Sequence, residues 1–213
     1  RHVEDQAFNV GVNPAFATRW LVPRLSQFQR AHPHIHINLI SNEIDSPSAA
    51  KDATVWIRYG SGPWPNVDST LLPIDAPLSV VCAPELLRRY GELQRPEDLL
   101  GKPLLAYTGG LQDLWQEFFE HFQLPASALA QARRFQQLLT LAEAAVSGLG
   151  FALVPLFLME PELKSGRLVK ALPQTFESCR KHFIIHSKGA ERDKKVQLFK
   201  RWVLSQAKKN LHQ

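Results

Sequence analysis

Cysteine is scarce in this chain. Cys82 and Cys179 are the only two in 213 residues, and they lie far apart without the C-x-x-C spacing of zinc ligands or redox pairs. The sequence therefore indicates neither a disulfide framework nor a cysteine-based zinc site, and reduced thiols are the simplest interpretation. Cys82 ends a predicted hinge strand, where a redox sensor would be useful, but its apolar neighbours favour a buried structural thiol.

Long apolar runs are also missing. The stretch Leu153–Met159 is far shorter than the roughly 20 residues that cross a bilayer, and Pro155 interrupts it. The N-terminal residues 1–7 are charged and have no signal-peptide pattern, although a mature secreted chain would lack one too. We therefore expect no membrane contact and a cytoplasmic location.

The familiar catalytic motifs are absent as well. The sequence contains no G-x-S-x-G, no H-E-x-x-H and no G-x-x-x-x-G-K-[ST] phosphate loop. Gly148 and Gly150 form a G-x-G, but Leu153 occupies the third glycine position and the pair follows a predicted helix, so a helix stop is the better interpretation. We expect no enzyme activity and no cofactor, because nothing supplies a nucleophile, a base and an oxyanion stabiliser together.

Positive charge is present but local. The net charge is +5, and eight lysines and arginines follow position 187 with only Glu191 and Asp193 among them. Apolar residues recur there at helical spacing, so the tail is predicted to be a closing helix with a solvated basic face. Phosphate binding is the alternative.

Three histidines, His32, His34 and His36, alternate along a predicted strand. Residues of one face of a strand are nearly 7 Å apart, which is wide for a single tetrahedral ion. The main interpretation is an alternating strand with Ile35 and Ile37 inward and the imidazoles outward, and a metal site is the alternative.

Short β-prone runs alternate with longer helical patterns along the whole chain. This alternation predicts an α/β fold with mainly parallel sheets. Pro23 predicts a kink near Val22 within a helix over residues 16–31, and residues 48–53 are expected to form a short helix. The expected strands cover residues 8–12, 34–40, 54–59, 78–82, 104–107, 133–136, 151–154 and 182–186.

Several stretches together resemble the effector-binding domain of LysR-type transcriptional regulators. They are F-N-V-G-V-N-P-A-F-A-T-R-W-L-V-P-R-L, A-H-P-H-I-H-I-N-L, W-I-R-Y-G-S-G-P-W-P, V-C-A-P-E-L-L and A-A-V-S-G-L-G-F-A-L-V-P. The third stretch is similar to the branch that contains the glycine-cleavage and β-lactamase regulators. The motifs are weak singly, but their order and spacing cover essentially the whole chain.

The resemblance implies two Rossmann-like lobes joined by two hinge crossovers, as in type II periplasmic binding proteins. Lobe I is expected to comprise residues 1–83 and 187–213, and lobe II residues 84–186. The resemblance also implies homodimers or homotetramers and an N-terminal winged helix-turn-helix that reads operator DNA. That DNA-binding domain is absent from this chain, so we expect a piece of a longer protein that does not bind its operator alone.

In the family the effector lies between the lobes, at helix starts and strand ends. Carried over by position, the candidate ligand-binding residues are Asn13, Ala15, Phe16, Thr18, Arg58, Tyr59, Thr108, Gln137, Leu138 and Thr140. Structural roles are the alternatives: a core position for Phe16, exposed helix positions for Thr18 and Thr140, and an acidic neighbour for Arg58.

The sequence departs from the family at three positions. Ala15 and Leu138 replace frequent hydroxyl residues, which makes the cleft less polar than is usual in the family. Thr54 stands where the family often has an acid. Arg58 would suit a carboxylate, so we expect a small carboxylate with an apolar portion. The alternative function is a free-standing periplasmic solute-binding protein of a transporter.

Overall fold

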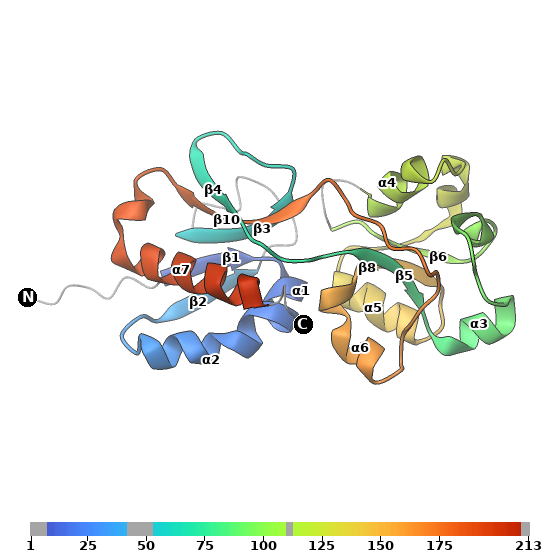
Figure 1. Ribbon diagram of the computed structural model, residues 1–213, viewed down its shortest axis with the longest axis horizontal. Coiled ribbons are helices and arrows are strands. Elements are labelled where there is room, and N and C mark those ends of the chain that lie inside the picture. The colour runs from blue at the N-terminus through green and yellow to red at the C-terminus, as the bar shows by residue number, and fades with distance from the viewer. Residues whose placement is uncertain (1–7, 42–52, 110–112, 210–213) are drawn as a thin grey trace, which may run out of the picture. The chain divides into compact units, whose positions relative to one another are not determined.

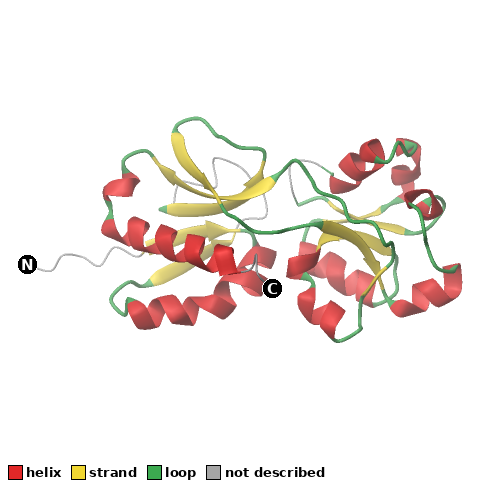
Figure 2. Cartoon of the chain, viewed as in Figure 1, coloured by secondary structure: helices red, strands yellow, loops and turns green. Residues whose placement is uncertain are grey.

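The chain folds into two compact α/β units. A computed structural model describes residues 8–41, 53–109 and 113–209 (Figure 1). The first unit comprises Arg1–Asp75 and Cys179–Gln213, and the second unit comprises Ala76–Ser178. The chain therefore passes from one unit to the other twice. Helices and strands occur in both units (Figure 2).

A mixed five-stranded sheet forms the centre of the first unit. Its strand order is β2-β1-β3-β10-β4, with β1 parallel to β2 and β3, and with β10 antiparallel to β3 and β4. The strands are β1 (Phe8–Val12), β2 (Ile37–Ser41), β3 (Val55–Gly60), β4 (Val67–Leu71) and β10 (Lys181–Ser187).

Pro23 shapes the helix that follows β1. The helix begins as α1 (Pro14–Phe16), continues as a π-helical turn at Ala17–Leu21 and ends as α2 (Val22–Ala31). Proline has no N–H for an i−4 bond, so the predicted disruption takes the form of a widened turn just before it. In that turn the Val22 N–H donates to the Ala17 carbonyl.

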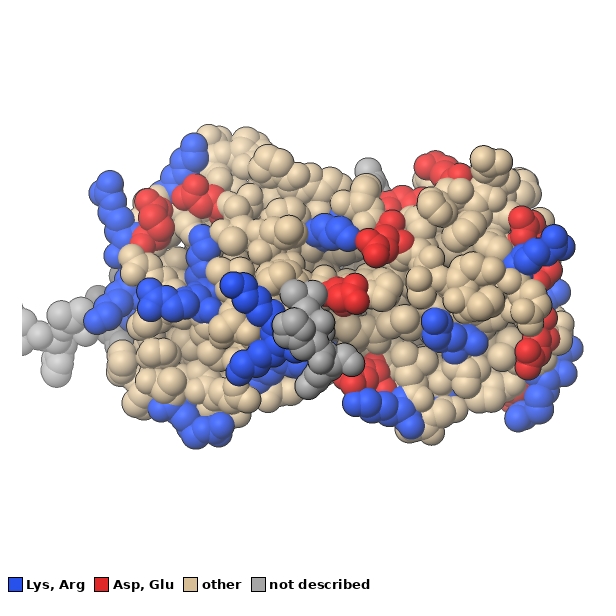
Figure 3. Space-filling view, viewed as in Figure 1, with Lys and Arg blue, Asp and Glu red and all other residues tan. Residues whose placement is uncertain are grey.

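Helix α7 (Lys194–Lys209) closes the first unit. It buries Val196, Phe199 and Val203, and the Phe199 ring lies 5.6 Å from that of Phe28 in α2. Lysine and arginine side chains gather on the opposite, solvent side of this helix (Figure 3). The predicted closing helix with a basic outer face is confirmed.

The second unit contains its own mixed sheet, in the order β7-β6-β8-β5-β9. Strands β6, β7 and β8 are mutually parallel where they pair, whereas β5 is antiparallel to β8 and β9. The strands are β5 (Leu78–Cys82), β6 (Leu104–Tyr107), β7 (Arg133–Phe135), β8 (Phe151–Pro155) and β9 (Val169–Lys170).

In the described part of the second unit, four α-helices and several short turns accompany this sheet. The helices are α3 (Pro84–Tyr90), α4 (Leu114–His121), α5 (Leu138–Val146) and α6 (Glu160–Lys164). Helix α4 buries Trp115, Phe118 and Phe119, and the Trp115 indole donates to the Leu105 carbonyl at 2.8 Å. Within the described residues, no helix is long and apolar enough to cross a bilayer.

Several predictions about elements need correction. The sheets are mixed and not mainly parallel, because β10 and β5 each run against their neighbours. Strand β4 was not predicted, and β2 begins at Ile37 and not at His34. The expected helix at 48–53 lies almost wholly outside the described residues.

The unit boundaries fall earlier than the predicted lobe boundaries at both crossings. Strand β5 pairs with β8 and β9, so residues 78–82 belong to the second unit. Strand β10 pairs with β3 and β4, so residues 181–186 belong to the first unit.

Candidate functional site

The helical segment after β1, together with its N-cap residue, carries four of the predicted ligand-binding residues. Asn13 caps α1, and its Oδ1 accepts a hydrogen bond from the Ala15 N–H at 2.9 Å. Ala15 and Phe16 are each 2% exposed, whereas Thr18 is exposed. The burial of these side chains therefore agrees with a structural role for Phe16 in the core and with an exposed helix position for Thr18.

His182 is a member of this site that the sequence did not reveal. It lies opposite Tyr59 in the β10–β3 ladder, and its ring is 4.8 Å from the Tyr59 ring and 5.1 Å from the Phe16 ring. Burial, together with a smaller contribution from the charge of Lys181, lowers the pKa of His182 to about 3. At neutral pH the site thus contains an uncharged imidazole between two aromatic rings. The only sequence signal was a polar residue at a buried position of a predicted strand.

Arg58 lies next to Tyr59 on β3 and is half-buried. Its guanidinium lies 5.5 Å from the centre of the Trp64 ring, a cation–π distance. Trp64 in turn packs edge-on against Phe183, whose register partner is Arg58. This packing places a cation at an aromatic surface of the first unit.

In the second unit, the predicted residues lie at the ends of β6 and β7. The Thr108 hydroxyl donates to the Phe135 carbonyl at 3.2 Å, and the Thr108 N–H donates to the same oxygen at 2.7 Å. Gly109 follows, and a side chain there would collide with the Gln136 carbonyl and the Tyr107 ring. The absence of a side chain lets the chain pass close to the start of α5.

The first turn of α5 carries Gln137, Leu138 and Thr140. Gln137 is the N-cap residue, and within the described residues its side chain caps no backbone N–H. Instead its Oε1 accepts a hydrogen bond from the Thr140 hydroxyl at 3.1 Å. Leu138 is 8% exposed, so it contributes apolar surface beneath this turn.

The structure thus arranges the ten predicted residues as two groups, one within each unit. Asn13, Ala15, Phe16, Thr18, Arg58 and Tyr59 belong to the first unit, and Thr108, Gln137, Leu138 and Thr140 belong to the second. Within the first group, the rings of Phe16 and Tyr59 pack against the neutral imidazole of His182 on one face of the sheet. Arg58 extends from the other face, where its neighbours are Trp64 and Phe183. The second group offers the start of a nine-residue helix, where backbone N–H groups attract anions.

The histidine run differs from its predicted arrangement, whereas Cys82 agrees with it. His32 caps the C-terminus of α2 and β2 begins only at Ile37, so the three histidines do not share one strand. Cys82 is buried, and burial raises its pKa to about 12, which confirms the structural thiol. Cys179 is exposed.

Comparison with known proteins gives one consistent result. The family model described as "LysR substrate binding domain" matches residues 1–208. An AmpR transcriptional activator of Citrobacter koseri is 32% identical over 95% of this chain and 68% of its own length. The glycine cleavage system transcriptional activator of Escherichia coli K12 is 32% identical over 94% of this chain and 65% of its own length. The chain therefore spans about two thirds of these relatives.

Solved structures agree with the sequence comparison. The effector domain of the transcriptional regulator AmpR of Pseudomonas aeruginosa superposes with a TM-score of 0.81 at 29% identity, covering 95% of this chain and 96% of that one. The AmpR effector binding domain from Citrobacter freundii has the same TM-score at 28% identity, with 95% and 98% covered. The named relatives are transcriptional regulators and not enzymes.

Proposed function

The chain belongs to the family of LysR substrate-binding domains, and from this premise we propose that it is the effector-sensing part of a LysR-type transcriptional regulator. The effector is a small molecule that binds between the two units. The relatives support this role, because they are named as transcriptional activators and their solved counterparts as effector domains. They also favour a regulator over a solute-binding protein of a transporter.

The signal passes from the effector to DNA through the assembly of the full protein. Binding shifts the balance between two arrangements of the units, and this shift changes the dimer or tetramer. Operator DNA is contacted by an N-terminal winged helix-turn-helix, and the protein works in the cytoplasm. The chain passes between the two units twice, and this supports such a hinge, because two connecting segments allow one unit to rotate against the other.

The effector is proposed to be a small carboxylate with an apolar portion, such as an amino acid or an aromatic acid. The half-buried Arg58 supplies a permanent positive charge on an aromatic surface. Phe16 and Tyr59 supply rings on the other face of the same sheet, and His182 between them stays neutral. Ala15 and Leu138 add apolar surface and no hydroxyl, which disfavours a polyol or sugar. The single observation that carries the carboxylate is the placement of Arg58.

Calorimetric titration tests this proposal. The chain is titrated with amino acids and aromatic acids, each matched to its amide or alcohol. We expect an acid to bind and its neutral analogue to bind at least about tenfold more weakly, because a hydrogen bond to a charged group contributes roughly 1.5–3 kcal/mol.

Arg58→Met then removes the guanidinium and keeps the length of the side chain. We expect it to weaken acid binding by about 10- to 100-fold. Arg88→Met, at an exposed position on α3, is the matched control and should bind normally. A preferred ligand without an acid group, or unchanged affinity in Arg58→Met, would contradict the carboxylate.

A further inference from the structure

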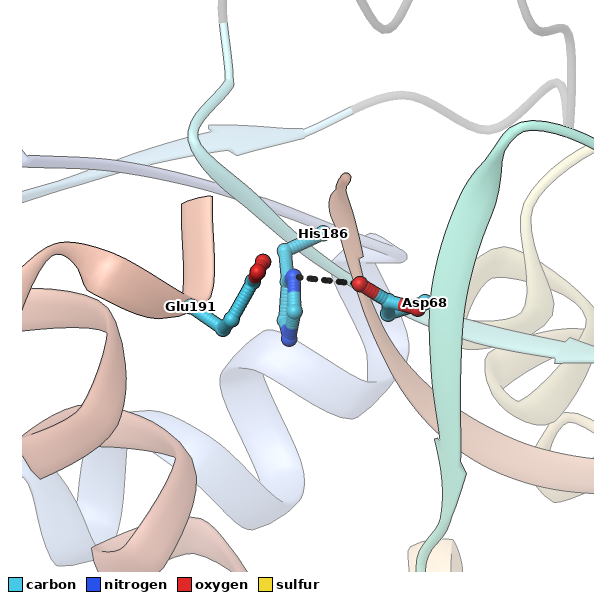
Figure 4. A group of neighbouring side chains, drawn as sticks. All are labelled: Asp68, His186 and Glu191. Atoms are coloured by element: carbon cyan, nitrogen blue, oxygen red, sulfur yellow. Dashed lines mark ion pairs between the residues drawn. The ribbon is translucent and has the colours of Figure 1, made fainter. Parts of the chain in front are cut away.

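Three metal-ligating side chains lie together on the first unit, outside the proposed effector site. They are Asp68 on β4, His186 on β10 and Glu191 in the short turn before α7 (Figure 4). One ligand atom from each lies within 4.8 Å of the others. The sequence did not single them out, because Asp68 is far from His186 and Glu191 in the chain.

The imidazole is the fixed member of this cluster. The His186 side chain is 1% exposed, whereas the Asp68 side chain is 48% exposed and Glu191 is exposed. Nδ1 of His186 lies 3.9 Å from Oδ2 of Asp68 and 3.1 Å from the Ser187 carbonyl oxygen. The two carboxylates stand on either side of Nδ1 in Figure 4. A buried ring thus presents one nitrogen toward oxygen ligands at the surface.

Glu191 is held beside the ring by the turn that contains it. Its Oε2 accepts a hydrogen bond from the Gly189 N–H at 2.7 Å. Hydrogen bonds from its own backbone N–H and from that of Gly189 lower the pKa of Glu191, so it is anionic at neutral pH. The cluster therefore combines an imidazole nitrogen with two carboxylates and a backbone carbonyl.

This set of donors suits a borderline divalent ion such as Zn²⁺, since Mg²⁺ and Ca²⁺ prefer oxygen alone. Metal–ligand distances near 2 Å place the ligands of tetrahedral Zn²⁺ roughly 3.3 Å apart. The carboxylates would have to approach Nδ1 by about an ångström, which their exposed side chains allow.

Lys200 occupies the other side of the ring. Its Nζ lies 3.4 Å from Nε2 of His186, and since an ammonium only donates, Nε2 accepts and Nδ1 carries the ring proton. An ion on Nδ1 requires the ring proton to move to Nε2, where Lys200 can no longer donate. Lys200 therefore favours the tautomer with the proton on Nδ1, which cannot bind the ion there.

We propose that Asp68, His186 and Glu191 form a binding site for a divalent transition-metal ion, with Zn²⁺ the best fit, and that Lys200 weakens this site. The ion joins β4 and β10 to the turn that leads into α7. No activity of the effector site is needed for it to bind.

Titration of the purified chain with Zn²⁺ tests the proposal directly. We expect one bound ion, and at least about tenfold weaker binding in Glu191→Gln and in Asp68→Asn, which keep the side-chain shapes and remove one ligand charge each. Lys200→Gln should strengthen binding by about tenfold, because the amide oxygen accepts from Nε2–H and supports the metal-bound tautomer.

Two control variants separate this site from other sources of Zn²⁺ binding. Glu85→Gln removes an exposed carboxylate on α3, and His34→Gln removes an imidazole of the histidine run; both should bind like the original chain. The proposal is overturned if no ion binds, if Glu191→Gln and Asp68→Asn leave the affinity unchanged, or if only His34→Gln loses binding. Stronger binding in Lys200→Gln cannot arise from a folding defect, so it is the most discriminating result.

Discussion

At the scale of single residues, burial decides which polar side chains of this protein are chemically active. Cys82 and Cys179 have the same functional group, yet one is buried and the other exposed. The buried imidazole of His182 is uncharged at neutral pH and packs between the rings of Phe16 and Tyr59 in the proposed effector site.

His182 also gives the fold a defined response to acid. Its pKa falls from 6.5 to about 3 on folding, so between these values the unfolded chain binds a proton that the folded chain does not. This contribution to stability is present above pH 6.5 and declines as the pH falls toward 3. At pH 5 the loss is about 2 kcal/mol relative to pH 8.

Urea unfolding at pH 8 and pH 5 measures this effect. We expect the His182→Gln variant to be less stable than the original chain at both pH values. Its free energy of unfolding should nevertheless decrease less between pH 8 and pH 5 than that of the original chain. His34→Gln, at an exposed position, should keep the original difference. An identical pH difference in His182→Gln would show that His182 is not the group responsible.

The two thiols provide a second test at this scale. The thiolate is the reactive form, and a pKa of about 12 leaves Cys82 protonated as well as enclosed. Iodoacetamide at pH 8 should modify Cys179 and spare Cys82, as read by mass spectrometry of peptides, and both should react in denaturant. Rapid labelling of Cys82 in the folded chain would contradict its burial.

At the scale of elements, helix starts position the residues on which both units depend. Asp113 begins α4, and its Oδ1 accepts from the Trp115 N–H at 2.9 Å. Trp115 is 1% exposed and donates to Leu105 of β6, so the cap aligns a core residue with the neighbouring strand. A local signal in the sequence thus controls a contact between helix and sheet.

Removing this cap should destabilise the second unit. We expect Asp113→Ala to lower the free energy of unfolding by about 1 kcal/mol, since an orphan N–H loses its acceptor. Asp113→Asn retains the cap, and should keep most of that stability, because its contact with Arg134 is long, at 4.0 Å, and partly exposed. Equal losses in the two variants would assign the effect to charge and not to capping.

At the scale of the whole molecule, the second unit is continuous in sequence and closes on itself. Its five strands all lie within Ala76–Ser178. Near its ends, Leu78 and Phe176 exchange two backbone hydrogen bonds of 2.8 Å. The first unit is instead assembled from two separate segments of chain.

The fragment 76–178 should therefore fold alone and unfold cooperatively. The fragment 84–186 is the matched comparison: it lacks β5, which pairs with both β8 and β9, and it carries β10 without its partners. We expect circular dichroism and thermal melting to show a folded first fragment and a poorly folded second one. Folding of 84–186 alone would support the lobe boundaries predicted from the sequence.

Local pattern was sufficient where an element follows a simple rule. Strands β1, β5 and β6 begin and end where the sequence predicts. Prolines and turn residues bound these apolar runs: Asn13-Pro14 follows β1, Pro77 precedes β5 and Pro103 precedes β6. Strand β4 escaped prediction because its segment V-D-S-T-L is polar and pairs on one side only, with β10. An edge strand needs little apolar surface, so its signal in the sequence is weak.

The amino-acid sequence by itself determined the fold class, the membership of the LysR family and the absence of a familiar catalytic motif. These properties depend on periodicity and on motifs that are local or ordered along the chain. Only the tertiary structure decided that His182 lies between Phe16 and Tyr59 and that Asp68 and Glu191 flank His186. It also decided that β5 belongs to the second unit and β10 to the first, which is the reverse of the prediction. Those facts depend on strand pairing between distant segments, and pairing is chosen by the packing of the whole sheet.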